Sequence, residues 1–208
     1  MLHYSAFCYA SNWYINRNRT TKCATCYNEY MKIYLARHAQ TNYNVLKLCN
    51  ADPSVDVHLS EEGINQAENL AELLKNVDYD VVYISELPRT RQTADIINKT
   101  HHKETIVDGR INDNKTGFES QPVADFLNSV ESAQDPWNAK FNDGESMNEA
   151  AERARHFIDE LRTKSYNSVL IVTHGFITQA IFGYLENKTL DEVSEFNLLQ
   201  GTYMEFEV

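Results

Sequence analysis

The sequence predicts an α/β protein in which a mostly parallel sheet lies between two layers of helices, a three-layer α/β/α sandwich. Apolar, β-branched runs at 81–84 and 168–173 are typical of buried strands. Segments with helical spacing of apolar residues alternate with such runs, and this alternation favours parallel strands joined by crossover helices. The 208 residues, 42% of them hydrophobic, are enough for one domain with a full core.

The elements follow from the same patterns in chain order. Ser60 suits the cap of a helix whose apolar positions, from Ile64 to Leu74, recur at helical spacing. Pro88 fits a first helical turn, and Ser146 to Glu149 form a capping box. We therefore expect strands at 32–36, 81–84, 104–107, 168–173 and 202–207, helices at 60–76, 88–99, 121–133, 146–164 and 175–186, and polar loops at 41–58 and 108–120.

Two histidines and two arginines are expected at one edge of this sheet. Arg37 and His38 follow the first strand, His174 follows the strand at 168–173, and Arg89 lies in the first turn of the helix after 81–84. Open α/β sheets bind ligands at the carboxyl ends of their strands. Guanidinium groups and helix N-termini both favour phosphate oxygens. The sequence therefore predicts a phosphate pocket at this edge.

Five ordered segments resemble the histidine phosphatase superfamily, also called the phosphoglycerate mutase-like family. They are RHAQTNYN at 37–44, HLSEEGINQA at 58–67, SELPRTRQTA at 85–94, DGES at 143–146 and THG at 173–175. Each motif alone is weak, but their common order makes chance agreement improbable. The resemblance implies a phosphoglycerate mutase-like fold, one domain over 31–208, and phosphoryl transfer to a histidine.

The resemblance also implies roles for individual residues. His38 is the expected nucleophile, attacking phosphorus as a neutral imidazole. Cationic and N–H donors would neutralise the phosphoryl oxygens and stabilise the transition state. The phosphate-binding set implied in this way is Arg37, Asn44, Arg89, His174 and Gly175, with His174 also counted as catalytic. No metal ion or other cofactor is expected.

The proton donor is expected to be Asp113. It occupies the place at which the family usually carries a glutamate, in the segment 111–120, and Glu119 is the alternative. Asp113 also has a purely structural interpretation, because Asn-Asp-Asn at 112–114 is a typical turn sequence. Glu145, in the DGES segment, is expected to shape the start of the following helix.

One departure from the family pattern is Ala39, which stands where the family normally has glycine. If that position needs a positive φ or a close approach of backbone to phosphate, the added Cβ would tilt or enlarge the pocket.

We expect a phosphatase that acts on a small phosphorylated metabolite, with water as the acceptor. The alternatives are a phosphoglycerate mutase-type transferase and, ranked below it, a binding module without turnover. The mutase is disfavoured because the chain is compact and lacks the extra segments typical of mutases. Specificity is expected from the loops at 42–58 and 108–145, where Tyr43, Phe118 and Trp137 are candidates.

The composition disfavours some classes of binding partner. A net charge of −11 disfavours nucleic acid and acidic membrane surfaces. No apolar run approaches the roughly 18–20 residues of a membrane helix. Of the four cysteines only Cys49 lies in the expected domain, so disulfides are not expected there, which fits a reducing compartment and predicts a cytoplasmic protein.

The first thirty residues differ from the rest. Residues 1–30 lack helical or alternating periodicity, a secretory leader pattern and an Arg-rich transit helix. We expect an extension without fixed structure, or sequence upstream of a translation start at Met31. The spacing of Cys23 and Cys26 suits metal or redox chemistry, but one such pair alone is weak evidence. The oligomeric state is left open by the sequence.

Overall fold

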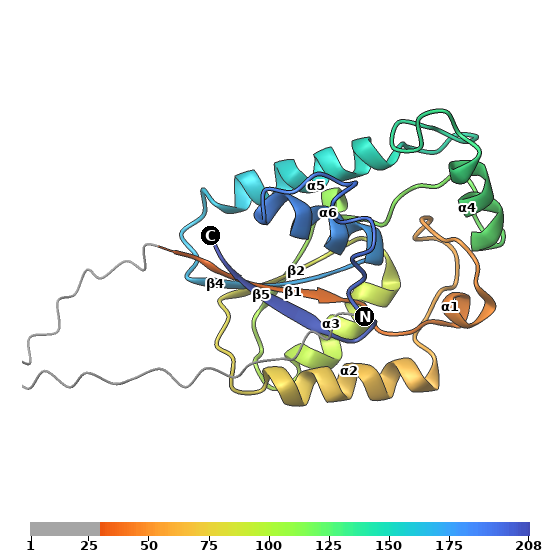
Figure 1. Ribbon diagram of the computed structural model, residues 1–208. Coiled ribbons are helices and arrows are strands. Elements are labelled where there is room, and N and C mark those ends of the chain that lie inside the picture. Colours follow the sequence, from red (N-terminus) through yellow and green to blue (C-terminus); the bar gives the residue numbers. More distant parts are fainter. Residues whose placement is uncertain (1–29) are drawn as a thin grey trace, which may run out of the picture.

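A five-stranded sheet in the order β3-β2-β4-β1-β5 forms the centre of the molecule (Figure 1). The computed structural model describes residues 30–208, so the expectations for the preceding segment and its cysteines lie outside the described residues. The strands are β1 (Lys32–Arg37), β2 (Val81–Ile84), β3 (Glu104–Val107), β4 (Ser168–Thr173) and β5 (Tyr203–Glu207). The first four run parallel and β5 pairs antiparallel with β1, which confirms the mostly parallel sheet.

Helices cover both faces of the sheet, as expected for a three-layer sandwich. In Figure 1, α5 and α6 lie on one face, α2 and α3 lie on the other, and α1 and α4 lie beyond the end toward which β1 points. The bounds are α1 (Asn42–Leu46), α2 (Glu61–Leu74), α3 (Pro88–Asn98), α4 (Val123–Glu131), α5 (Met147–Leu161) and α6 (Gly175–Leu185), with a 3-10 turn at Gly109–Ile111.

The core divides into two layers because strand side chains alternate between the faces. In β1, Ile33 and Leu35 belong to the cluster that α5 and α6 cover, whereas Tyr34 and Ala36 belong to the cluster under α2 and α3. All six residues of β4 are buried, as expected for a central strand covered on both faces.

Two sequence expectations need correction. The segment 41–58 is not wholly loop, because Thr41 caps the short helix α1 through a capping box and Lys47 ends it at a φ of 57°. Ile64, expected on the buried face of its helix, is 44% exposed. The predicted caps at Ser60 and Ser146 are confirmed, and Pro88 does open α3.

No helix within residues 30–208 is long and apolar enough to cross a bilayer.

The start of α2 lies directly on the backbone just after β1. Gln40 accepts a hydrogen bond from the Ser60 N–H at 3.0 Å, and its own N–H donates to Gln66 Oε1 at 2.9 Å. Gly63 lies so close that a Cβ there would be 1.9 Å from the Gln40 carbonyl oxygen. Glycine at position 63 therefore allows this helix to hold the loop that follows β1.

We expect Gly63→Ala to lower the free energy of unfolding by about 1–3 kcal/mol, because the added methyl overpacks against rigid backbone. Asn65→Ala, at an exposed position on the same helix, should change it by less than about 0.5 kcal/mol. Denaturant unfolding of the two variants measures the difference. Equal stabilities would contradict the packing argument.

Candidate active site

The two strand-end histidines meet because their strands are neighbours. Arg37 and Thr173 are paired at the ends of β1 and β4, and the His38 N–H donates to the Thr173 carbonyl at 2.9 Å. The rings of His38 and His174 lie with their centroids 5.2 Å apart. The structure thus brings both predicted histidines to the carboxyl edge of the sheet.

One ring nitrogen of His38 carries no proton. Its Nδ1 lies 2.8 Å from the Ala39 carbonyl oxygen, which can only accept, so Nδ1 carries the proton. Its Nε2 is therefore unprotonated, and its lone pair accepts a hydrogen bond from Arg89 Nε at 3.2 Å. Burial, and next the nearby Arg89 guanidinium, lower the pKa of His38 well below its usual value. The ring is therefore a neutral imidazole with its proton on Nδ1 and its lone pair on Nε2.

Arg89 is a buried cation, 3% exposed, with several partners. Its Nη1 donates to Asn50 Oδ1 at 2.7 Å, and its Nη2 donates to the Asn50 carbonyl at 3.1 Å and to Asp113 Oδ2 at 2.9 Å. These contacts fix the guanidinium plane beside the Nε2 atom of His38. Asn50 was not singled out from the sequence, and its loop carries no motif that would reveal it.

Arg37 comes from the end of β1 and lies against the first residue of α6. Its Nη1 donates to Asn197 Oδ1 and to the Leu198 carbonyl, each at 2.8 Å. Its Nε is buried and has no hydrogen-bond partner within residues 30–208. A Cβ on Gly175 would lie 3.0 Å from Arg37 Cζ, so glycine gives this guanidinium its space.

His174 is completely buried between the ends of β2 and β1. Its Nε2 lies 2.8 Å from Ser85 Oγ, the residue after β2. Its Nδ1 lies 3.6 Å from Asp113 Oδ2, too far for a hydrogen bond, and has no partner within the described chain. Burial, and then the charge of Arg89, lower the pKa of His174 well below its usual value. When the Ser85 hydroxyl donates to Nε2, Nδ1 carries the proton on the side of Asp113.

Asn44 offers its amide N–H groups to the cavity. Its Oδ1 accepts from the Thr41 N–H at 3.0 Å, from Thr41 Oγ1 at 2.9 Å and from Gln200 Nε2 at 2.6 Å. The side-chain oxygen is therefore occupied, which orients the NH₂ group as a donor. Gln200 lies 156 residues further along the chain, so sequence reasoning could not have identified it.

Arg37, His38, Asn44 and Arg89 line a cavity of about 220 Å³, whereas the fully buried His174 does not line it. Its polar part contains Arg37, His38, Thr41, Asn44, Asn50, Arg89, Asp113 and the start of α6 at Gly175. The remaining wall is largely apolar and comes from the loop after α1, from α4, and from the first turns of α5 and α6. The cavity thus combines a phosphate-sized cluster of donors with an apolar wall.

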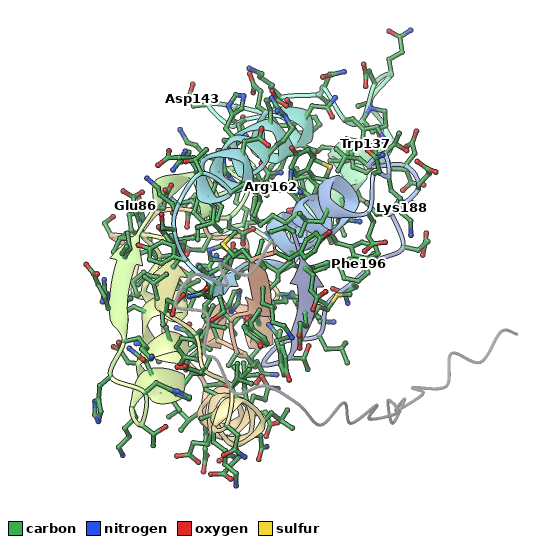
Figure 2. All side chains as sticks on the ribbon, turned by 90° about the vertical axis from the view of Figure 1, so that its left-hand side faces the viewer. Glu86, Trp137, Asp143, Arg162, Lys188 and Phe196 are labelled. Atoms are coloured by element: carbon green, nitrogen blue, oxygen red, sulfur yellow. The ribbon has the colours of Figure 1, made fainter. Side chains whose placement is uncertain are left out.

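The three residues considered for substrate specificity lie in different places. Tyr43 lines the cavity. Phe118 instead packs against Phe126, with centroids 5.9 Å apart. Trp137 donates from Nε1 to Asp191 Oδ1 at 2.6 Å and lies on the same side of the molecule as Lys188, outside the cavity (Figure 2).

The two carboxylates considered as proton donors have different positions. Asp113 lines the cavity, with Oδ2 on Arg89 and Oδ1 accepting the Asn114 N–H at 3.0 Å. Glu119 lies outside the cavity and accepts from Asn50 Nδ2 at 2.8 Å and from the Ala51 N–H at 2.7 Å. Glu119 therefore supports Asn50, whereas Asp113 makes both a local turn contact and a contact in the site.

Arg153 of α5 anchors the backbone around Asp113 and was not singled out from the sequence. Its guanidinium donates to the carbonyls of Arg110 at 2.8 Å, Asn112 at 2.7 Å and Asp113 at 3.0 Å. Glu145 binds the same guanidinium at 2.6 and 3.0 Å. The expectation that Glu145 shapes the start of α5 is therefore wrong in detail, because Ser146 and Glu149 cap that helix and Glu145 braces Arg153.

The expected consequence of Ala39 does not arise. Ala39 has no positive φ, and it packs with Leu59 and Ala67 outside the cavity. Its N–H donates to Thr93 Oγ1 at 3.1 Å while its carbonyl accepts from His38. The added methyl group is thus accommodated by the core under α2 and α3.

Residues 33–208 match the family described as the histidine phosphatase superfamily (branch 1). The chain belongs to the histidine phosphatase superfamily. It is 30% identical over 183 residues to phosphoserine phosphatase 1 of Hydrogenobacter thermophilus, covering 83% of this chain and 84% of that protein. It is also 30% identical to the probable phosphoglycerate mutase GpmB of Erwinia tasmaniensis, over 70% of each chain.

Solved structures agree with the fold of this histidine phosphatase. A putative α-ribazole-5′-P phosphatase of Escherichia coli K-12 superposes with a TM-score of 0.76 at 24% identity, over 86% of this chain and 90% of that one. The family and its phosphatase-named members make the chain a hydrolase of the phosphatase class.

The burial of two neutral histidines predicts a pH dependence of stability. Below the ordinary histidine pKa of about 6.5 the unfolded rings bind protons that the folded rings do not, so acid favours unfolding. We expect the free energy of unfolding to fall between pH 6.5 and pH 5.5, by up to about 1.4 kcal/mol per pH unit for each ring. Denaturant unfolding across this range measures the slope.

The slope should become smaller in His174→Gln, because one buried ring that stays neutral in the folded protein is removed. An unchanged slope in His174→Gln would show that this ring is not held neutral by burial.

Proposed function

We propose that this histidine phosphatase hydrolyses small phosphomonoesters, without a metal ion, through a phosphohistidine intermediate on His38. The observation that carries the proposal is the state of the His38 ring. Its Nδ1 proton is tied to the Ala39 carbonyl, which directs the lone pair of the neutral Nε2 to the cavity beside Arg89. A neutral, oriented imidazole next to permanent cations is what attack on a phosphate dianion requires.

In the first step, His38 Nε2 forms a bond to phosphorus as the bond from phosphorus to the ester oxygen breaks. The electron pair of that bond goes to the leaving oxygen, which takes a proton from Asp113. Arg37, Arg89, the Asn44 amide and the N–H of His174 and Gly175 stabilise the charge on the three remaining oxygens. Two guanidinium groups supply the neutralisation that metal ions supply in other phosphoryl-transfer sites.

In the second step, water replaces the alcohol. Asp113, now a carboxylate, takes a proton from the water as its oxygen attacks phosphorus and the bond from phosphorus to Nε2 breaks. Inorganic phosphate leaves, and both His38 and Asp113 return to their starting protonation states. The same carboxyl therefore acts as general acid and then as general base.

A mutase is the second candidate, because relatives of the chain include a probable phosphoglycerate mutase. A mutase would have to hold a glycerate that carries a carboxylate and two phosphoryl groups. In the part of the chain that the structure describes, Arg37 and Arg89 are the only lysine or arginine residues that line the cavity, and Arg89 already faces Asp113. This limited positive charge favours water over a second phosphorylated molecule as the acceptor of the phosphoryl group. A binding module is disfavoured because binding alone does not need the oriented lone pair of His38.

His38→Ala should lower phosphate release by more than about 1,000-fold, because the atom that forms the intermediate is lost. Release by the unchanged protein should persist in excess EDTA. A panel of phosphomonoesters with inorganic phosphate as the readout measures both effects. Quenching the reaction with base during turnover should trap phosphate on His38. Mass spectrometry should detect the phosphorylated histidine.

His58→Ala is the matched control, since its ring is exposed outside the cavity, and it should retain normal activity. Full activity in His38→Ala, loss of activity on chelation, or transfer that requires an added bisphosphoglycerate would each overturn the proposal.

Asp113→Asn should discriminate between leaving groups. For an alkyl phosphate, kcat/KM should fall by about 100-fold or more, because the departing alkoxide needs a proton. For 2,4-dinitrophenyl phosphate it should fall by less than about tenfold, because that leaving group departs without one. Arg153→Lys should show the same pattern to a smaller degree, since it displaces the Asp113 backbone without removing the carboxyl.

Arg155→Lys is the control on the same helix, because Arg155 pairs with the α5 carboxylates Glu152 and Asp159 and does not line the cavity. It should leave both substrates unaffected. Equal losses for the two substrates in Arg153→Lys would mean that Arg153 supports folding and does not position the proton donor.

A further inference from the structure

Few charged side chains line the cavity. Within residues 30–208, Arg37, Arg89 and Asp113 are the only Lys, Arg, Asp or Glu side chains that line it. The two cations approximately balance the two negative charges of one phosphate ester, and Arg89 already shares its charge with Asp113 at 2.9 Å. The part of the cavity that would receive the organic group of a substrate offers no cation.

The apolar part of the cavity wall is well supported. It includes Leu48, Val57, Val123, Phe126, Met147 and Phe176. Backbone hydrogen bonds tie the loop after α1 to the start of α4, since the Cys49 N–H donates to the Gln121 carbonyl and the Val123 N–H to the Lys47 carbonyl, each at 2.9 Å. Behind this wall Phe126 packs edge-on against Phe141, with centroids 6.2 Å apart. The wall is therefore preformed.

The nearby lysines do not change this charge. Lys115 follows the Asp113 segment but lines a neighbouring hollow with Asp143 and Glu145, and Asp143 lies at the outer edge of the molecule in Figure 2. Lys47 is exposed and does not line the cavity. A carboxylate on a substrate would therefore lose water without gaining a cationic partner, which is unfavourable beside an apolar wall.

We propose that the preferred substrates are monophosphate esters whose organic group is small, uncharged and apolar, an aryl or alkyl group held by the wall of α4 and the loop after α1. The inference rests on the proposed function and names its substrate class. A volume of about 220 Å³ suits a small ligand, since sites for drug-sized molecules measure about 300–1,000 Å³. This class differs from the phosphoserine and phosphoglycerate in the names of relatives.

The test compares two aryl esters that differ in charge but little in leaving-group acidity, 4-ethylphenyl phosphate and 4-(carboxymethyl)phenyl phosphate. We expect kcat/KM to favour the ethyl compound by at least about tenfold, since apolar contact is replaced by an unpaired carboxylate. The ratio should persist at 1 M salt, where the Debye length is about 3 Å, because it arises from contact and not from the net charge of the protein.

A variant tests the location of this selectivity. Leu127 lines the cavity, is 53% exposed and takes no part in the proposed chemistry, so a lysine there reaches the mouth without entering the core. Leu127→Lys should raise kcat/KM for the carboxymethyl ester by about tenfold relative to the ethyl ester. Leu127→Gln, which is polar but uncharged, should not.

Equal use of the two esters, a preference for the carboxymethyl ester, or a ratio that Leu127→Lys leaves unchanged would overturn the inference while leaving the proposed function intact. A ratio that disappears at 1 M salt would overturn it as well. Absence of phosphate release from both esters would overturn the proposed function, and the substrate class with it.

Discussion

The arrangement of the site depends on the burial of one positive charge, the guanidinium of Arg89. A buried charge is tolerated only when hydrogen-bond acceptors surround it. Here the acceptors are His38 Nε2, the side chain and carbonyl of Asn50, and Asp113 Oδ2. These acceptors come from three different segments of the chain, so satisfying one cation fixes the relative positions of His38, the loop after α1 and the Asp113 segment.

The strand order makes this convergence possible. Because β4 lies between β2 and β1, His174 at the end of β4 falls between Ser85 after β2 and His38 after β1. Arg89 comes from α3, the helix that follows β2, and therefore starts at the same edge. The sequence allowed this prediction because buried parallel strands read as apolar runs, and the residues after them must lie at the carboxyl edge.

Other parts of the site could not be predicted from the sequence, for a physical reason. Asn50, Arg153 and Gln200 contribute through hydrogen bonds to residues 39 to 156 positions away, and no periodicity or capping rule encodes such pairs. Helix α1 was missed because it is only five residues long, and its capping box at Thr41 lies inside a family motif. The effect of Ala39 was misjudged because the direction of its Cβ depends on backbone angles that the sequence does not reveal.

Arg89 contacts both groups to which the proposed mechanism gives a chemical step. Its Nε donates to the Nε2 lone pair of His38, and its Nη2 donates to the Asp113 carboxyl group. A phosphate dianion competes for both donors, because charge-assisted contacts to its oxygens replace those to His38 and Asp113. In the proposed mechanism, its arrival would free the lone pair of His38 Nε2 and remove the cation from Asp113. Arg89 would thus couple substrate binding to both His38 and Asp113, and Arg153, which holds the Asp113 backbone, would keep the carboxyl in reach after its ion pair is broken.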